Sequence, residues 1–127
     1  MRKLRGRPHV LIVDDDRDAR SIYRTYLQHT GCRVRTAPDG AKAIDKAHRD
    51  PPDVIVMDLA MPRLDGWTAS KWLKGSPATS HIPIIAVSAA PQAREGARAV
   101  GCDGFLAKPC QPDLLWWEIR ALLNPHK

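Results

Sequence analysis

The sequence lacks any long hydrophobic run. The apolar residues 10–13 are followed at once by three aspartates, whereas a membrane-spanning helix needs about 20 apolar residues. The N-terminus is basic, but no apolar stretch long enough for a signal peptide follows it. We therefore expect no membrane association and a cytoplasmic location.

Cysteine is scarce, and neither cysteine nor histidine is spaced as in a zinc site. The residues concerned are Cys32, Cys102, Cys110, His9, His29, His48, His81 and His126. We expect the cysteines to be small buried side chains in a reducing compartment. We expect the histidines to lie at the surface or in hydrogen-bonded positions. The absence of GxGxxG and P-loop motifs is evidence against enzymes that use dinucleotides or nucleoside triphosphates.

Acidic residues are absent from the first eight positions, where four of the 20 basic residues lie. The four are Arg2, Lys3, Arg5 and Arg7, and the rest of the chain has 16 basic and 14 acidic residues. A basic stretch of this kind can contact nucleic acid or an acidic protein face. No aromatic residue lies among these four, which is evidence against single-strand binding, and we do not expect direct nucleic-acid binding. We interpret residues 1–7 as a basic N-terminal extension.

What the sequence does contain is a regular alternation of short apolar runs with longer amphipathic ones. The apolar runs predict buried strands at 9–13, 32–37, 54–57, 82–87 and 104–107. The amphipathic segments predict five helices, which begin near residues 17, 40, 66, 91 and 112. This order predicts a doubly wound α/β fold with a parallel sheet. The length suits one domain, over residues 8–124, with a short tail at 125–127.

The helix near residue 17 has a clear apolar face and a clear start signal. Its core-facing residues are predicted to be Ala19, Ile22, Tyr23, Tyr26 and Leu27. Asp16 or its neighbour is expected to cap this helix, and Asp65 and Gly66 are expected to shape the loop before the third helix and cap it.

Polar residues follow four of the predicted strands. They are Asp14, Asp15 and Asp16 after the first strand, Asp58 after the third, Ser88 after the fourth and Lys108 after the fifth. Ligands of open parallel sheets bind at the carboxyl ends of the strands. Carboxylates placed together repel one another unless a cation lies between them, and hard oxygen ligands suit Mg²⁺. Because aspartate can accept a phosphoryl group, the pattern suggests Mg²⁺ and a phosphorylated aspartate.

Several runs of the sequence together resemble response-regulator receiver domains. They are VLIVDDD at 10–16, VMDLAMP at 56–62, LDG at 64–66, AVSA at 86–89 and FLAKP at 105–109. The resemblance covers roughly residues 8–123. It implies a flavodoxin-like fold with five helices, a five-stranded sheet of order 2-1-3-4-5, and a cis Lys108–Pro109 bond.

The resemblance also implies a role for each residue of the site. Asp58 is expected to be the phosphoacceptor, with Ser88 and Lys108 contacting the phosphoryl group. Asp14, Asp15, Asp58 and the backbone carbonyl of Ala60 are the expected Mg²⁺ ligands. Ser88 and Phe105 are the expected switch pair.

The expected partners are a histidine kinase or a histidine phosphotransfer domain. Leu114 and Trp117 lie on a separate face of the last helix, and exposed apolar residues of this kind can mark a partner site. The resemblance implies a homodimer or target surface built from the fourth helix, the fifth strand and the fifth helix.

The expected function is that of a phosphoacceptor in a two-component phosphorelay. The protein would catalyse only its own phosphorylation and dephosphorylation and would not be an enzyme acting on a foreign substrate. One alternative is a phosphate-independent pseudo-receiver that acts as a binding module. A phosphatase of the haloacid-dehalogenase type would carry a second acid two residues after its nucleophile, where this sequence has Ala60.

Overall fold

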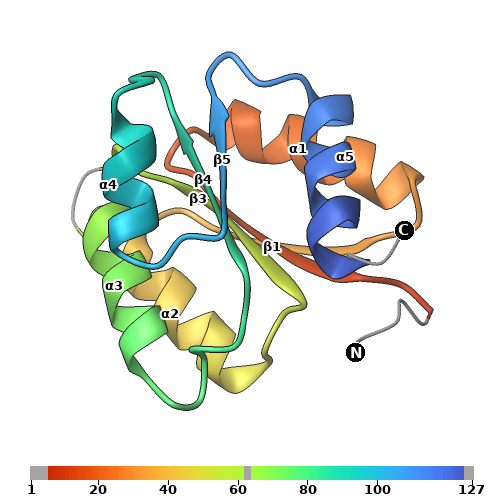
Figure 1. Ribbon diagram of the computed structural model, residues 1–127. Helices are drawn as coiled ribbons and strands as arrows, with labels where there is room; N and C mark the ends of the chain where they lie inside the picture. The colour runs from red at the N-terminus through yellow and green to blue at the C-terminus, as the bar shows by residue number, and fades with distance from the viewer. Residues whose placement is uncertain (1–5, 62–63, 125–127) are drawn as a thin grey trace.

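The computed structural model describes residues 6–61 and 64–124. Residues 1–5 of the expected N-terminal extension at 1–7, Pro62, and the tail at 125–127 lie outside the described residues. The chain alternates strands and helices throughout (Figure 1). The strands are β1 (His9–Val13), β2 (Arg33–Ala37), β3 (Val54–Asp58), β4 (Ile84–Ser88) and β5 (Gly104–Ala107). The helices are α1 (Arg17–His29), α2 (Gly40–Arg49), α3 (Gly66–Gly75), α4 (Ala93–Ala99) and α5 (Pro112–Leu123).

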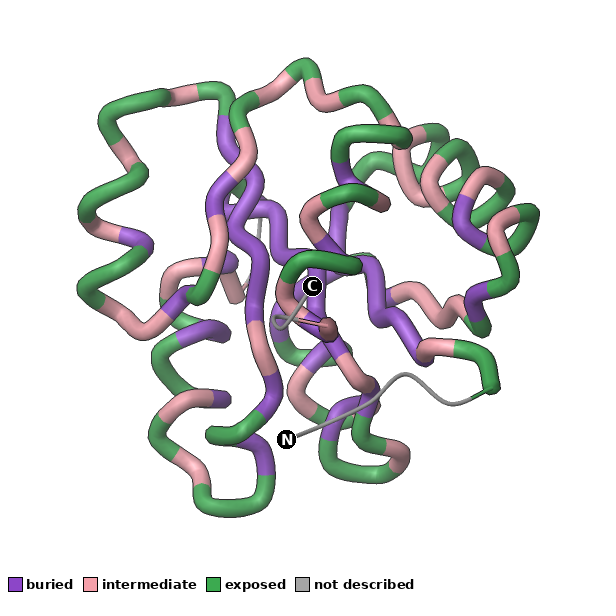
Figure 2. The backbone as a smooth tube through the Cα atoms, turned by 45° about the vertical axis from the view of Figure 1, so that its right-hand side comes forward, coloured by how far each residue is buried: buried purple, intermediate pink, exposed green. Residues whose placement is uncertain are grey.

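The five strands form one parallel sheet in the order β2-β1-β3-β4-β5, which confirms the predicted fold and topology. Helices α2, α3 and α4 cover one face of the sheet, and α1 and α5 cover the other (Figure 1). The three central strands are buried along their whole length, as their β-branched sequences predict (Figure 2). Alternate residues of each strand therefore enter two separate cores.

Side-chain caps fix where three helices begin. Asp16 accepts a hydrogen bond from the backbone N–H of Asp18, and Asp65 accepts one from Thr68, which confirms both predicted caps. Asp39 caps α2 in the same way, through the N–H of Lys42. These caps hold the loops at the carboxyl ends of the strands.

Three expectations about single residues were wrong. His9 is buried, as the predicted strand at 9–13 implies, but its Nε2 has no hydrogen-bond partner among the described residues, so it lies neither at the surface nor in a fully hydrogen-bonded position. Ile22 is 57% exposed because α1 turns it toward solvent, although the other residues of its predicted face are buried or half-buried. Cys32 and Cys102 are buried as expected, but Cys110 is half-buried, since it lies in the loop between β5 and α5.

Candidate functional site

Three carboxylates meet at the carboxyl end of the sheet. One oxygen of each of Asp14, Asp15 and Asp58 lies within 4.8 Å of the other two. Asp14 and Asp58 are buried, and Asp15 is exposed. The strand order explains this meeting, because β1 and β3 are neighbours and end at the same edge.

Asp14 is fixed by bonds to both its main chain and its side chain. Its N–H donates to the carbonyl of Ala37 at 3.1 Å, and its Oδ1 accepts from the N–H of Asp16 at 2.9 Å. The guanidinium of Arg20 donates to its carbonyl at 2.8 Å. Burial raises the pKa of Asp14, and the charge of Asp58 adds to this effect, while the Asp16 bond opposes it. A nearby cation would therefore stabilise the ionised form of Asp14.

Asp58 is the last residue of β3, and its two carboxylate oxygens have different partners. Oδ1 accepts from the N–H of Ala60 at 3.1 Å, and Oδ2 accepts from the ammonium of Lys108 at 3.1 Å. The loop closes tightly behind it, since a Cβ on Gly66 would lie 2.1 Å from the carbonyl oxygen of Asp58. Only glycine allows this approach, a requirement that the sequence pattern did not reveal.

Lys108 comes from β5's end and reaches both buried carboxylates. Its Nζ lies 3.1 Å from Asp58 and 3.9 Å from Asp14, and its N–H donates to the carbonyl of Ser88 at 2.9 Å. Burial works to lower the pKa of Lys108, but the Asp58 hydrogen bond and the nearby acids raise it overall. The bond between Lys108 and Pro109 is cis, as expected.

The expected switch residues lie on adjacent strands, β4 and β5. Ser88 is buried, and its Oγ accepts from the N–H of Ala90 at 3.0 Å, which orders the start of the following loop. Phe105 is also buried, and the guanidinium carbon of Arg94 lies 4.9 Å from the centre of its ring. An arginine from α4 therefore covers the expected switch aromatic, a contact that the sequence did not indicate.

An open pocket of about 390 Å³ adjoins the carboxylates. It lies between α1 and the loop after β5, and its lining includes Asp14, Ile22, Lys108, Pro109 and Cys110. Tyr23 closes one side, and its hydroxyl donates to the carbonyl of Cys110 at 2.9 Å. Burial raises the pKa of Tyr23 to about 12. The exposed side chain of Ile22 thus lies beside the charged site.

The donor set suits a divalent cation with oxygen ligands. Three carboxylates converge, two of them buried, and no histidine or cysteine joins them among the described residues. This chemistry fits Mg²⁺ better than zinc. The expected backbone ligand, Ala60, lies two residues beyond Asp58 and bonds to it through its N–H.

The two residues named for the expected partner surface are both exposed apolar side chains on α5. Leu114 is 54% exposed and Trp117 is 66% exposed. The guanidinium carbon of Arg120 lies 5.4 Å from the ring of Trp117 and 5.5 Å from the ring of Trp116. Trp116 packs against the core, whereas Trp117 does not. Within the described residues, no helix is long and apolar enough to cross a membrane.

Comparisons with known proteins agree with this arrangement. The family model of the response regulator receiver domain matches residues 10–120. Response regulator MprA of Mycobacterium tuberculosis is 37% identical over 120 residues, which are 93% of this chain and 51% of that protein. A probable transcriptional regulator, ycf27 of Guillardia theta, is 35% identical over 95% of this chain and 47% of that protein. The chain thus spans about half the length of these curated relatives.

Solved structures give the same result. Chemotaxis protein CheY4 of Vibrio cholerae has a TM-score of 0.86 and 32% identity, covering 92% of this chain and 99% of that chain. The receiver domain of the sensor histidine kinase PA1611 of Pseudomonas aeruginosa, solved with a magnesium ion in its active site cleft, has a TM-score of 0.84. It is 28% identical and covers 92% of this chain and 98% of that chain. The fold and the acidic site define a receiver of the two-component type. This chain belongs to the response regulator receiver domain family.

Proposed function

We propose that Asp58 accepts a phosphoryl group from a phosphohistidine donor in a Mg²⁺-dependent reaction. The observation that carries this proposal is the position of Asp58 between the Lys108 ammonium and the acidic pair Asp14 and Asp15. The carboxylate is buried at a strand end and has a cation on one side and a candidate cation site on the other.

In the proposed transfer, a carboxylate oxygen of Asp58 forms a bond to phosphorus while the bond between phosphorus and the donor imidazole nitrogen breaks. The imidazole takes up the electron pair and leaves. The ammonium of Lys108 would neutralise negative charge on the phosphoryl oxygens, since its Nζ already lies 3.1 Å from Asp58. Bound Mg²⁺, held by Asp14, Asp15, Asp58 and the carbonyl of Ala60, would supply further charge neutralisation.

The donor would be a histidine kinase or a histidine phosphotransfer domain. The donor could reach Asp58 through the pocket beside Asp14 and Lys108. The exposed side chain of Ile22 would give it an apolar contact next to the charged site. The protein would catalyse its own phosphorylation and dephosphorylation and would not turn over a foreign substrate.

Phosphorylation would change the protein through Ser88 and Phe105. The Oγ of Ser88 accepts from the N–H of Ala90, and turning toward a phosphoryl oxygen would release that bond and the loop that it orders. The guanidinium of Arg94, on α4, lies over the ring of Phe105. A change in the loop before α4 would therefore move Arg94 relative to this ring. The output would be a change in the surface of α4, β5 and α5.

The primary experiment compares the chain with its Asp58→Asn variant, treated with a small-molecule phosphodonor and Mg²⁺. Intact-protein mass spectrometry should detect one added phosphoryl group on the parent and none on the variant. Asp18→Asn, an exposed acid outside the site, is the matched control and should be phosphorylated like the parent. Undiminished phosphorylation of Asp58→Asn would contradict the assignment.

A phosphate-independent pseudo-receiver is the alternative, and magnesium titration separates the two. The three converging carboxylates favour the phosphoacceptor, because such a cluster is costly without a cation. Calorimetric titration should show saturable Mg²⁺ binding that Asp14→Asn weakens. Absence of binding by the parent would favour the alternative.

Leu114 and Trp117 are proposed to form part of a homodimer or target surface. Their exposure on the same helix supports this, since neighbouring exposed apolar side chains can mark a partner site, whereas a single one needs no explanation. Trp117→Ala should lower self-association or partner affinity by roughly tenfold, the size of effect expected for an aromatic anchor. Exposed Trp72 on α3 offers a matched control, Trp72→Ala. Unchanged sedimentation and partner binding in Trp117→Ala would remove this residue from the proposal.

A further inference from the structure

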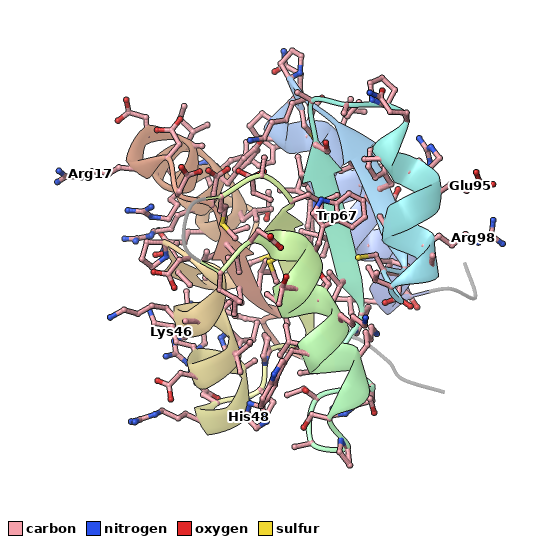
Figure 3. All side chains as sticks on the ribbon, turned by 90° about the vertical axis from the view of Figure 1, so that its left-hand side faces the viewer. Arg17, Lys46, His48, Trp67, Glu95 and Arg98 are labelled. Atoms are coloured by element: carbon pink, nitrogen blue, oxygen red, sulfur yellow. The ribbon has the colours of Figure 1, made fainter. Side chains whose placement is uncertain are left out.

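Helices α1 and α2 and the strand between them carry a large excess of positive charge. Residues 17–50 contain eight arginines and lysines and four aspartates. Arg17 on α1 and Lys46 on α2 lie along the same side of the molecule (Figure 3). The charge is therefore concentrated where β2 forms the edge of the sheet.

The cations of the two helices meet at Thr36 on β2. The guanidinium of Arg24, from α1, donates to Oγ1 of Thr36 at 3.2 Å, and the ammonium of Lys46, from α2, donates to its carbonyl at 2.5 Å. Burial lowers the pKa of Lys46, and the positive charges of Arg35 and Lys42 lower it further. These groups repel one another across the edge strand.

Among the described residues, the arginines of β2 form their ion pairs with Asp50, at one end of this edge. Asp50 pairs with Arg33 and with Arg35, the second at 3.1 Å. Over residues 6–61 and 64–124, no ion pair joins a carboxylate to Arg24 or Lys42. At the opposite end of β2, Arg24 and Lys46 bring cations from both faces of the sheet. The acid that follows this end, Asp39, caps α2.

The same strand has main-chain groups that face outward. The N–H of Arg33 donates to Pro8, and the carbonyl of Ala37 accepts from Asp14, so these residues face β1. In a parallel sheet, the main-chain N–H and C=O groups of successive residues point to alternate sides of the strand. Those of Val34 and Thr36 therefore point away from β1, toward the open edge of the sheet. Lys46 is the partner of the Thr36 carbonyl, and no strand pairs with this side among the described residues.

We propose that the outer edge of β2 binds an extended acidic segment of a partner protein, which adds to the sheet as a further strand. Its main chain would bond to Val34 and Thr36, and its carboxylates would lie between the cations of α1 and α2. Nucleic acid or an anionic membrane would only neutralise the positive charges of this surface. An extended peptide would also form hydrogen bonds with the main-chain groups of β2. Lys46 would exchange its bond to Thr36 for a carboxylate.

The test uses a synthetic peptide of alternating glutamate and threonine and follows amide hydrogen exchange by NMR. Peptide binding should slow exchange at Val34 and Thr36. The amide of Arg33 is the internal reference, because its bond to Pro8 already protects it. Unchanged exchange at Val34 and Thr36 with saturating peptide would overturn the proposal.

Charge-reversal variants separate this surface from general attraction to a basic protein. Arg24→Glu combined with Lys42→Glu should weaken peptide binding roughly tenfold or more, because it replaces attraction with repulsion. Lys71→Glu combined with Arg98→Glu makes the same charge change at exposed positions of α3 and α4 and should have a much smaller effect. Equal losses in both pairs would overturn the proposal. So would tighter binding of short duplex DNA or phosphatidylserine vesicles to the same surface.

Discussion

The ammonium of Lys108 lies between two buried carboxylates, 3.1 Å from Asp58 and 3.9 Å from Asp14. It is the only lysine or arginine that forms an ion pair with these acids in the described part of the chain. Lys108 therefore offsets the repulsion of the acidic cluster in the absence of a metal. Its ammonium would also compete with Mg²⁺ for the carboxylate of Asp58.

We expect Lys108→Met to raise Mg²⁺ affinity and to lower phosphorylation. Methionine keeps much of the apolar stem, so the main change is the loss of one positive charge beside the cluster. Mg²⁺ affinity should rise about tenfold by calorimetry, the scale of an ion pair of about 1.4 kcal/mol. Lys71→Met changes an exposed lysine of α3 and should leave both readouts unchanged. Weaker Mg²⁺ binding in Lys108→Met would show that Lys108 does not compete for Asp58.

We expect Asp14→Asn to stabilise the fold in the absence of Mg²⁺ and to reduce the further stabilisation that Mg²⁺ provides. The asparagine oxygen can still accept the bond from Asp16, while the repulsion with Asp58 and Asp15 disappears. The free energy of unfolding without Mg²⁺ should rise by about 1 kcal/mol, a size typical of single substitutions. Denaturant unfolding with Mg²⁺ or a chelator checks this. A variant less stable than the parent in chelator would mean that repulsion is not the dominant effect.

We expect Gly66→Ala to damage the site without changing any of its polar side chains. The new Cβ would lie 2.1 Å from the carbonyl oxygen of Asp58 and 2.7 Å from the Cα of Leu59, so the backbone must move. The free energy of unfolding should fall by about 2–3 kcal/mol, and Mg²⁺ affinity should fall with it. Gly75→Ala, at the other end of α3, meets nothing within 4 Å and should be neutral or slightly stabilising. Equal effects of the two substitutions would contradict this account.

We expect the stability of the fold to decrease as the pH falls through the ordinary titration range of histidine, because His9 is buried. Burial lowers the pKa of His9, and Arg33 and Arg35 lower it further, while Asp50 and Asp53 oppose them. The unfolded chain therefore binds the proton at a higher pH than the native state. The contribution of neutral His9 is complete above about pH 6.5 and is lost progressively below it.

The measurement for His9 is denaturant unfolding between about pH 7.5 and 5.5. His9→Phe should flatten the pH dependence in this range, because phenylalanine does not titrate. His29→Gln removes an exposed histidine and should leave the slope unchanged. A slope that persists in His9→Phe would assign the effect to other groups.

The sequence was sufficient for most of the fold. The alternation of apolar runs with amphipathic segments depends on local hydrophobic periods of two and 3.6 residues, which do not need tertiary information. The caps at Asp16 and Asp65 are local in the same sense, since each bonds to a backbone group two or three residues away. Where prediction failed, the cause was not local. The missing partner of His9 Nε2 and the exposure of Ile22 depend on how neighbouring strands and loops pack around them.

The sequence by itself determined which residue types follow each strand, and so the acids, hydroxyl and lysine of the site. Only the tertiary structure decided the distances among them, because the order β2-β1-β3-β4-β5 brings Asp14, Asp58 and Lys108 together from far along the chain. The same order leaves β2 at an edge and turns scattered arginines and lysines of α1 and α2 into one basic surface. Contacts of this kind arise from strand pairing, which no local period encodes.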